Sequence, residues 1–173
     1  MNLIRHCHSI ASLPIIAGLM GLCNAVAVNA GTPGDACALL TAPQVSSALG
    51  ASVGPGQPLM PNNTTICTWS EQGAPAASAR NVTVSLMTAK SFENGKTPMT
   101  GITKTPVSGI GDDAYFTEPH GMTAGFSVRK GDACFQVRAR SNSQWFKTGK
   151  TPESEQKDQG VDRALALEIL KKL

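Results

Sequence analysis

The segment MTAGFSVRKGDACFQVRAR, residues 122–140, constrains the fold most, because two alternating stretches flank a turn dipeptide. Gly131 and Asp132 suit a two-residue type II′ turn, since glycine tolerates the positive φ of the first position. The segment therefore predicts an antiparallel hairpin. A four-residue loop would change the cross-strand pairing but would leave each side chain on the same face. The sequence therefore predicts the faces more strongly than the pairing. The two-residue register places Val128 opposite Phe135 and Phe126 opposite Val137 toward the core, with Arg129 opposite Cys134 and Ser127 opposite Gln136 facing outward.

Two further stretches read as strands. ICTWS, residues 66–70, would place Cys67 and Trp69 on one face, and NVTVSLMT, residues 81–88, alternates apolar and polar residues. Residues 51–64 are rich in Gly, Pro and Asn and predict a loop. Residues 89–101 are ambiguous, with at most one helical turn followed by loop.

Helices are predicted near both ends of the domain. Thr41 and Gln44 have the spacing of a capping box, and Gly50 supplies a stop, which predicts a short helix between them. Thr151 followed by proline predicts the start of a second helix, whose firmest part is residues 161–173 because Gly160 weakens the beginning. This second helix carries an apolar stripe with a four-residue repeat. Turns rather than crossover helices link the strands, so we expect an α+β domain, with an antiparallel sheet and both helices on one face.

Residues 1–30 have the pattern of a secretory signal peptide. An apolar run follows Arg5, and VNA suits cleavage after Ala30, with a weaker alternative after Ala27. Lipidation of Cys23 is disfavoured because Leu22 is not small. No later stretch is apolar enough to cross a bilayer, so we expect no membrane anchor after cleavage. The prediction is a secreted or periplasmic bacterial protein with one domain, residues 31–173.

The net charge of +3 for the whole chain is too weak to indicate a nucleic acid or a membrane surface as partner. Three cysteines, Cys37, Cys67 and Cys134, remain after cleavage. An oxidising compartment favours a disulfide. Because three is odd, one thiol stays free, pairs between chains or binds something.

The order CALLT, a short helix, CTW, GIGDDA, a hairpin and a terminal helix resembles a broad group of secreted bacterial domains of unknown function that are common among envelope lipoproteins. It is also similar to the extracellular sensor domains of some actinobacterial serine/threonine kinases. The resemblance spans most of residues 36–173. It implies a disulfide between Cys37 and Cys67, no catalytic residues, and no role for Cys134, which is then the free thiol. The chain departs from the lipoproteins in having no lipobox.

The segment SGIGDDAYFTEPHG, residues 108–121, holds acidic residues and His120, which are residue types found in metal and catalytic sites. Asp112 and Asp113 are adjacent and would point to opposite faces of a strand. The segment is better explained as a glycine-containing turn, in which an aspartate side chain accepts backbone N–H groups, followed by a strand. No nucleophile motif, C-x-x-C pair or phosphate loop accompanies it. We therefore expect no catalytic residues, no metal site and no cofactor.

The remaining candidate site is basic. Arg129, Arg138 and Arg140 share the outward face of the hairpin, and Trp145 follows it. Such a face could bind an anionic envelope polymer or another envelope protein, although a solvated strand face is the simpler interpretation. The sequence thus predicts a non-catalytic binding or interaction module of unknown partner. The alternatives are an envelope enzyme or inhibitor with a site built from loops, and a structural subunit that dimerises through Cys134.

Overall fold

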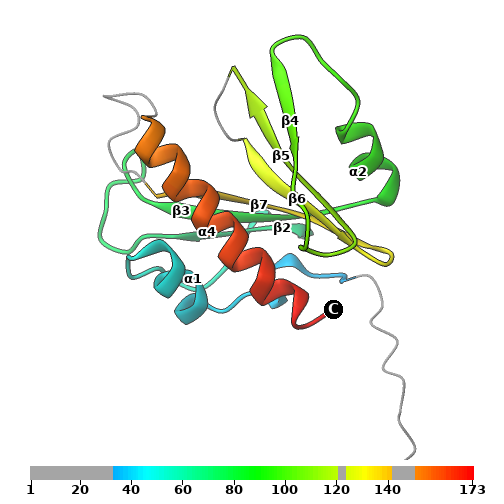
Figure 1. Ribbon diagram of the computed structural model, residues 1–173. Helices are drawn as coiled ribbons and strands as arrows, with labels where there is room; N and C mark the ends of the chain where they lie inside the picture. Colours follow the sequence, from blue (N-terminus) through cyan, green and yellow to red (C-terminus); the bar gives the residue numbers. More distant parts are fainter. Residues whose placement is uncertain (1–32, 121–123, 142–150) are drawn as a thin grey trace, which may run out of the picture.

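The computed structural model describes residues 33–120, 124–141 and 151–173 (Figure 1). The predicted signal peptide, residues 1–30, and Trp145 lie outside this part of the chain. The elements in chain order are η1 (Ala36–Ala38), α1 (Ala42–Leu49), β1 (Gln57–Met60), β2 (Asn63–Ser70), β3 (Asn81–Met87), α2 (Ala89–Gly95), β4 (Ile102–Pro106), β5 (Asp113–Pro119), β6 (Gly125–Lys130), β7 (Ala133–Arg140) and α4 (Pro152–Leu170).

The strands form one seven-stranded antiparallel sheet in the order β1-β2-β3-β7-β6-β5-β4. Hairpins join β1 to β2, β2 to β3, β4 to β5, β5 to β6 and β6 to β7. The connection from β3 runs through α2 to β4, which lies at the far edge of the sheet. The chain then returns through β5 and β6, so that β7 pairs with β3. Figure 1 shows β4 and β5 rising steeply from the layer of β2, β3 and β7, so the sheet is strongly twisted.

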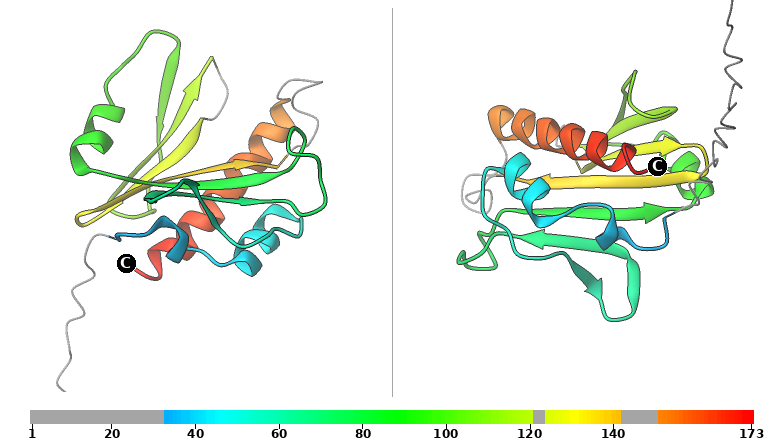
Figure 2. Two further views of the ribbon diagram at one scale, coloured as in Figure 1. Left: turned by 180° about the vertical axis from the view of Figure 1, so that it is seen from behind. Right: turned by 90° about the horizontal axis from the view of Figure 1, so that it is seen from below.

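Helices α1 and α4 pack on the same face of the sheet, as predicted (Figure 2, right). Their buried side chains meet an apolar layer from the strands that includes Trp69, Phe126 and Phe135. The capping box between Thr41 and Gln44 is present, and Gly50 ends α1 with a φ of 66°. The predicted α+β architecture is therefore confirmed, including the two helices on one face.

The β6–β7 hairpin has the predicted two-residue register. Val128 pairs with Phe135 and Arg129 pairs with Cys134. Gly131 has a φ of 56°, the positive value expected at the first turn position. Because side chains alternate along each strand, this register fixes which residues of the hairpin face the core and which face away from it.

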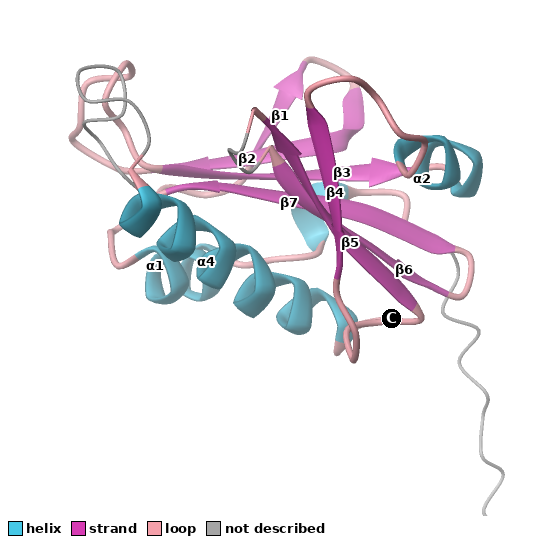
Figure 3. Ribbon diagram, turned by 45° about the horizontal axis from the view of Figure 1, so that its top comes forward, coloured by secondary structure: helices cyan, strands magenta, loops and turns pink. Residues whose placement is uncertain are grey.

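Several elements differ from the sequence prediction. The expected loop at residues 51–64 contains β1 and the first two residues of β2, and the ambiguous region at residues 89–101 contains α2. β4 follows that region, at residues for which no element was predicted. β1 and β4 are the two edge strands of the sheet (Figure 3). Every residue of β1 is exposed, so the strand lacks the alternation of buried and exposed positions that marks a half-buried strand. α4 also begins earlier than its firm part, at Pro152, and continues through Gly160.

A disulfide joins Cys37, in η1, to Cys67, in β2, across 30 residues of sequence. This is the pairing that the family resemblance implies. Cys67 and Trp69 are both buried on the core face, as the alternation of β2 predicts. No helix in the described ranges is long and apolar enough to cross a membrane.

Candidate functional site

The outward face of the β6–β7 hairpin is the face opposite α1 and α4. Pairing across the neighbouring strands aligns Arg138 with Thr83 of β3, and Thr83 with Thr68 of β2. The hydroxyls of Thr68 and Thr83 lie 3.1 Å apart. Arg140 aligns with Asn81 in the next outward row. This part of the face is therefore a polar surface with two arginines, and below we call it the Arg138 face: Thr68, Asn81, Thr83, Arg138 and Arg140.

Helix α2 covers the other end of the same face. Thr88 caps the helix, and Phe92 is fully buried where it packs on Tyr115 and Cys134. The ring centroids of Phe92 and Tyr115 are 5.2 Å apart, and the Tyr115 hydroxyl donates to the Phe92 carbonyl oxygen at 3.1 Å. The outward face thus carries a second, smaller apolar cluster that the sequence analysis did not predict.

Because α2 packs over this end of the hairpin, Cys134 and Arg129 are less accessible than the sequence analysis implied. Cys134 points outward from the hairpin and is a free thiol, as expected, but it is only 1% exposed. The cause is α2, which buries the thiol and raises its pKa. Arg129 is also engaged, because its guanidinium donates to Glu93 of α2 at 3.1 Å. It is therefore neutralised by an acidic residue from outside the hairpin.

Arg138 and Arg140 remain at the opposite end of β7. Arg138 is exposed and makes no ion pair within the part of the chain that the structure describes. Arg140 is half-buried, and its pKa is lowered first by that burial and then by the positive charge of Arg138, against the opposing effect of Asp158. The charge of Arg138 thus acts on Arg140 together with that of Asp158, whereas Arg138 itself is exposed to solvent.

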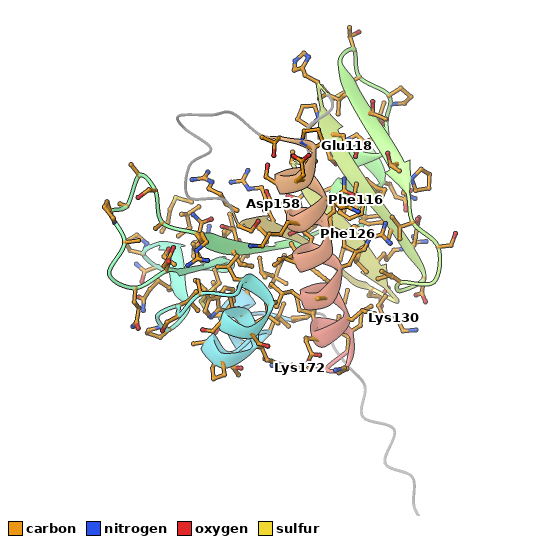
Figure 4. All side chains as sticks on the ribbon, turned by 60° about the vertical axis from the view of Figure 1, so that its left-hand side comes forward. Phe116, Glu118, Phe126, Lys130, Asp158 and Lys172 are labelled. Carbon is orange, nitrogen blue, oxygen red and sulfur yellow. A yellow bond between two sulfur atoms is a disulfide. The ribbon has the colours of Figure 1, made fainter. Side chains whose placement is uncertain are left out.

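Two buried carboxylates anchor α4 to this end of β7. Asp162 Oδ1 accepts the backbone N–H of Ala139 at 2.6 Å, and Asp158 Oδ1 accepts that of Ser141 at 2.7 Å. The aspartates are 1% and 2% exposed (Asp158 is labelled in Figure 4). The pairing of β7 with β6 ends at Val137, so these later N–H groups have no β6 partner, and α4 supplies the acceptors.

The spacing of Asp158 and Asp162 in the sequence could have predicted that these carboxylates are buried. Asp158 and Asp162 are four residues apart, and they continue the apolar stripe of Leu165 and Ile169 toward the helix start. Acidic residues in register with an apolar stripe indicate side chains that face the core and need a hydrogen-bond donor there.

The acidic turn at residues 108–121 has a structural role. Gly109 and Gly111 both have positive φ, and Asp112 Oδ2 accepts the N–H of Gly131 at 2.6 Å. This hydrogen bond lowers the pKa of Asp112. An aspartate does accept a backbone N–H, but the predicted partner was wrong, because the N–H belongs to the β6–β7 turn. Asp113 points the other way and forms an ion pair with Lys96.

His120 ends the same segment. It has a φ of 49°, and its backbone N–H donates to the Gly101 carbonyl oxygen at 2.8 Å. Among the residues that the structure describes, no group of three or more His, Cys, Asp or Glu side chains is placed to hold a metal ion.

Comparison of the chain with protein-family models, with curated proteins and with solved structures gives no match. The family resemblance of the CALLT, CTW and GIGDDA segments therefore stays a prediction, and function has to be inferred from the geometry of the chain itself.

Proposed function

We propose that the protein is a non-catalytic binding module of the bacterial envelope, exported by residues 1–30, and that the Arg138 face binds an anionic envelope polymer. The observation that carries the proposal is the contrast between Arg138 and two other arginines, Arg129 of β6 and Arg80, which precedes β3. Arg129 and Arg80 have carboxylate partners, Glu93 and Glu71, whereas Arg138 is exposed and has none in the described part of the chain.

The surroundings of Arg138 favour an extended ligand over a small one. It lies in a row of side chains across β2, β3 and β7, and the described helix on that side, α2, packs at the other end of β7, beside Cys134. Arg138 and Arg140 are two residues apart on one strand, so their Cα atoms are separated by about 6–7 Å. Two cations at this spacing can contact neighbouring carboxylate or phosphate groups along a polymer.

Export is supported by two independent features. The disulfide between Cys37 and Cys67 suits an oxidising compartment, since such bonds are rare in the bacterial cytosol. The resemblance to secreted bacterial domains points to the same location and to a role without catalysis.

The proposal is tested by titrating the mature protein with alginate, a polyuronate, and with dextran as a neutral polysaccharide. We expect saturable binding of alginate that weakens as the ionic strength rises from about 20 mM to about 300 mM, because charge interactions at a surface are screened. We expect Arg138→Glu to abolish it. Lys90→Glu is the matched control, since Lys90 is an exposed residue of α2 that undergoes the same change of charge away from the face.

An equal loss in Arg138→Glu and Lys90→Glu would mean that binding follows net charge alone, and the proposal would be wrong. Binding of dextran as strong as that of alginate would also overturn it. The alternative, dimerisation through Cys134, requires α2 to leave the sheet, because the thiol is 1% exposed beneath it. A disulfide-linked dimer of the native protein on a non-reducing gel, absent in Cys134→Ser, would favour that alternative.

A further inference from the structure

A second candidate site lies between the end of α2 and the outer strands β4 and β5. It is an open pocket of about 380 Å³, lined by three charged residues, Lys96, Lys104 and Asp113, and by Pro98, Ile102, Pro106, Ala114 and Tyr115. Pro98 belongs to the connection that runs from α2 to the start of β4 (Figure 1). The volume falls in the range of small-molecule sites, which is roughly 300–1,000 Å³.

Most of the lining is apolar. Ile102, Lys104 and Pro106 are alternate residues of β4, so their side chains share one face of the strand. Pairing places Pro106 beside Tyr115 and Lys104 beside Thr117 on β5. The two prolines, the isoleucine and the tyrosine ring give the pocket rigid apolar walls suited to the body of a small organic molecule.

The two lysines of the pocket differ in their partners. Lys96 lies 2.9 Å from a carboxylate oxygen of Glu93 and 2.5 Å from one of Asp113, so its charge is compensated twice. Lys104 instead donates to the Thr117 hydroxyl at 3.1 Å and lies 5.6 Å from the centre of the Tyr115 ring. Within the described ranges, no carboxylate lies within ion-pair distance of Lys104.

Lys104 therefore keeps a positive charge in a half-buried position with neutral partners only. Burial lowers its pKa, which shows that the charged form is disfavoured there without a counter-ion. A negatively charged group that entered the pocket would supply that counter-ion, and it could also accept a hydrogen bond from the Thr117 hydroxyl. The apolar walls would hold whatever is attached to the charge.

We propose that this pocket binds a small organic carboxylate with an apolar body, with Lys104 as its counter-ion and Tyr115, Ile102 and the two prolines around the body. The site is separate from the Arg138 face, because it is built from β4, β5 and the α2–β4 connection and contains neither arginine. It thus adds a small-molecule ligand to the proposed polymer binding and does not depend on it.

The test uses phenylacetate, with phenethyl alcohol and phenethylamine as probes that keep the aromatic body and change the head group. Binding is followed by isothermal titration and by the chemical shifts of the Tyr115 ring, the chain's one tyrosine. We expect phenylacetate to bind saturably, the alcohol at least tenfold more weakly and the amine not at all. Lys104→Met should weaken phenylacetate about tenfold or more, since a hydrogen bond to a charged group contributes roughly 1.5–3 kcal/mol.

Two further variants keep the test decisive. Lys104→Arg retains the charge and should retain binding, whereas Lys90→Met removes an exposed lysine of α2 outside the pocket and should leave binding unchanged. Absence of saturable phenylacetate binding to the folded wild type would overturn the proposal. Equal binding of acid and alcohol, or a Lys104→Met variant that is folded and binds as the wild type does, would overturn it too.

Discussion

Asp162 of α4 accepts the backbone N–H of Ala139 at 2.6 Å, where both residues are buried and β7 has passed the end of its pairing with β6. Asp158 repeats the contact with Ser141 at 2.7 Å. A helix side chain thus replaces a strand as the hydrogen-bond partner of β7. The pair of contacts sets where α4 crosses the sheet, next to the strand that carries Arg138 and Arg140.

We expect Asp162→Ala to lower the free energy of unfolding by about 1–3 kcal/mol, because it leaves a buried N–H group without its acceptor. Asp162→Asn keeps an acceptor oxygen and should cost less. Urea unfolding followed by circular dichroism measures both. Gln156→Ala, an exposed substitution on the same helix, is the control. An Asp162→Ala variant as stable as the control would show that the contact does not hold α4 in place.

Stability at acidic pH should depend on Glu71. Hydrogen bonds from the Arg80 side chain and backbone lower the pKa of Glu71 from the usual 4.5 to about 2. Because the folded-state pKa is the lower one, the stabilisation is fully present above about pH 4.5 and is lost as the pH falls toward 2. The difference in melting temperature between wild type and Glu71→Gln should therefore be constant near neutral pH and shrink over that window.

The control for this pH profile is Asp132→Asn, which removes an exposed carboxylate that has no ion pair in the described part of the chain. A difference for Glu71→Gln that stays unchanged down to pH 2 would contradict the assigned role of the ion pair with Arg80.

Cys134 should resist alkylation in the folded protein. The thiol is 1% exposed under Phe92, and burial raises its pKa, so both access and the thiolate fraction are reduced. We expect iodoacetamide to label Cys134 slowly in buffer and rapidly in denaturant. Phe92→Ala should speed labelling at least tenfold without changing the far-UV spectrum, because it opens α2 locally. Fast labelling of the folded wild type would mean that α2 does not cover the thiol.

Loss of the disulfide should lower the free energy of unfolding. The bond between Cys37 and Cys67 closes a segment of 30 residues, for which the chain-entropy model gives about 3–4 kcal/mol. The double variant Cys37→Ala/Cys67→Ala should therefore unfold at a markedly lower urea concentration. Reducing agent should destabilise the wild type and leave the double variant unaffected. Equal sensitivity of the two proteins to reduction would point to a different pairing.

Local patterns predicted those parts of the fold whose structure depends on near neighbours in sequence. The capping box at Thr41, the register around Gly131 and the buried alternation of β2 and β3 all appear as predicted. β1 was missed because an edge strand with no buried face has no alternation to detect. α2 was left ambiguous because its single buried large residue, Phe92, cannot produce a periodic pattern.

For the candidate sites, too, some features follow from local sequence and others only from the tertiary structure. The sequence alone determined that Arg129, Cys134, Arg138 and Arg140 share one face of a hairpin, because side chains alternate along a strand whatever surrounds it. Only the tertiary structure decided that α2 covers one end of that face and leaves Arg138 exposed at the other, that Asp162 reaches Ala139, and that Lys104 lies in a pocket whose one carboxylate, Asp113, pairs with Lys96 instead. These outcomes depend on contacts between segments far apart in the chain, which no local pattern encodes.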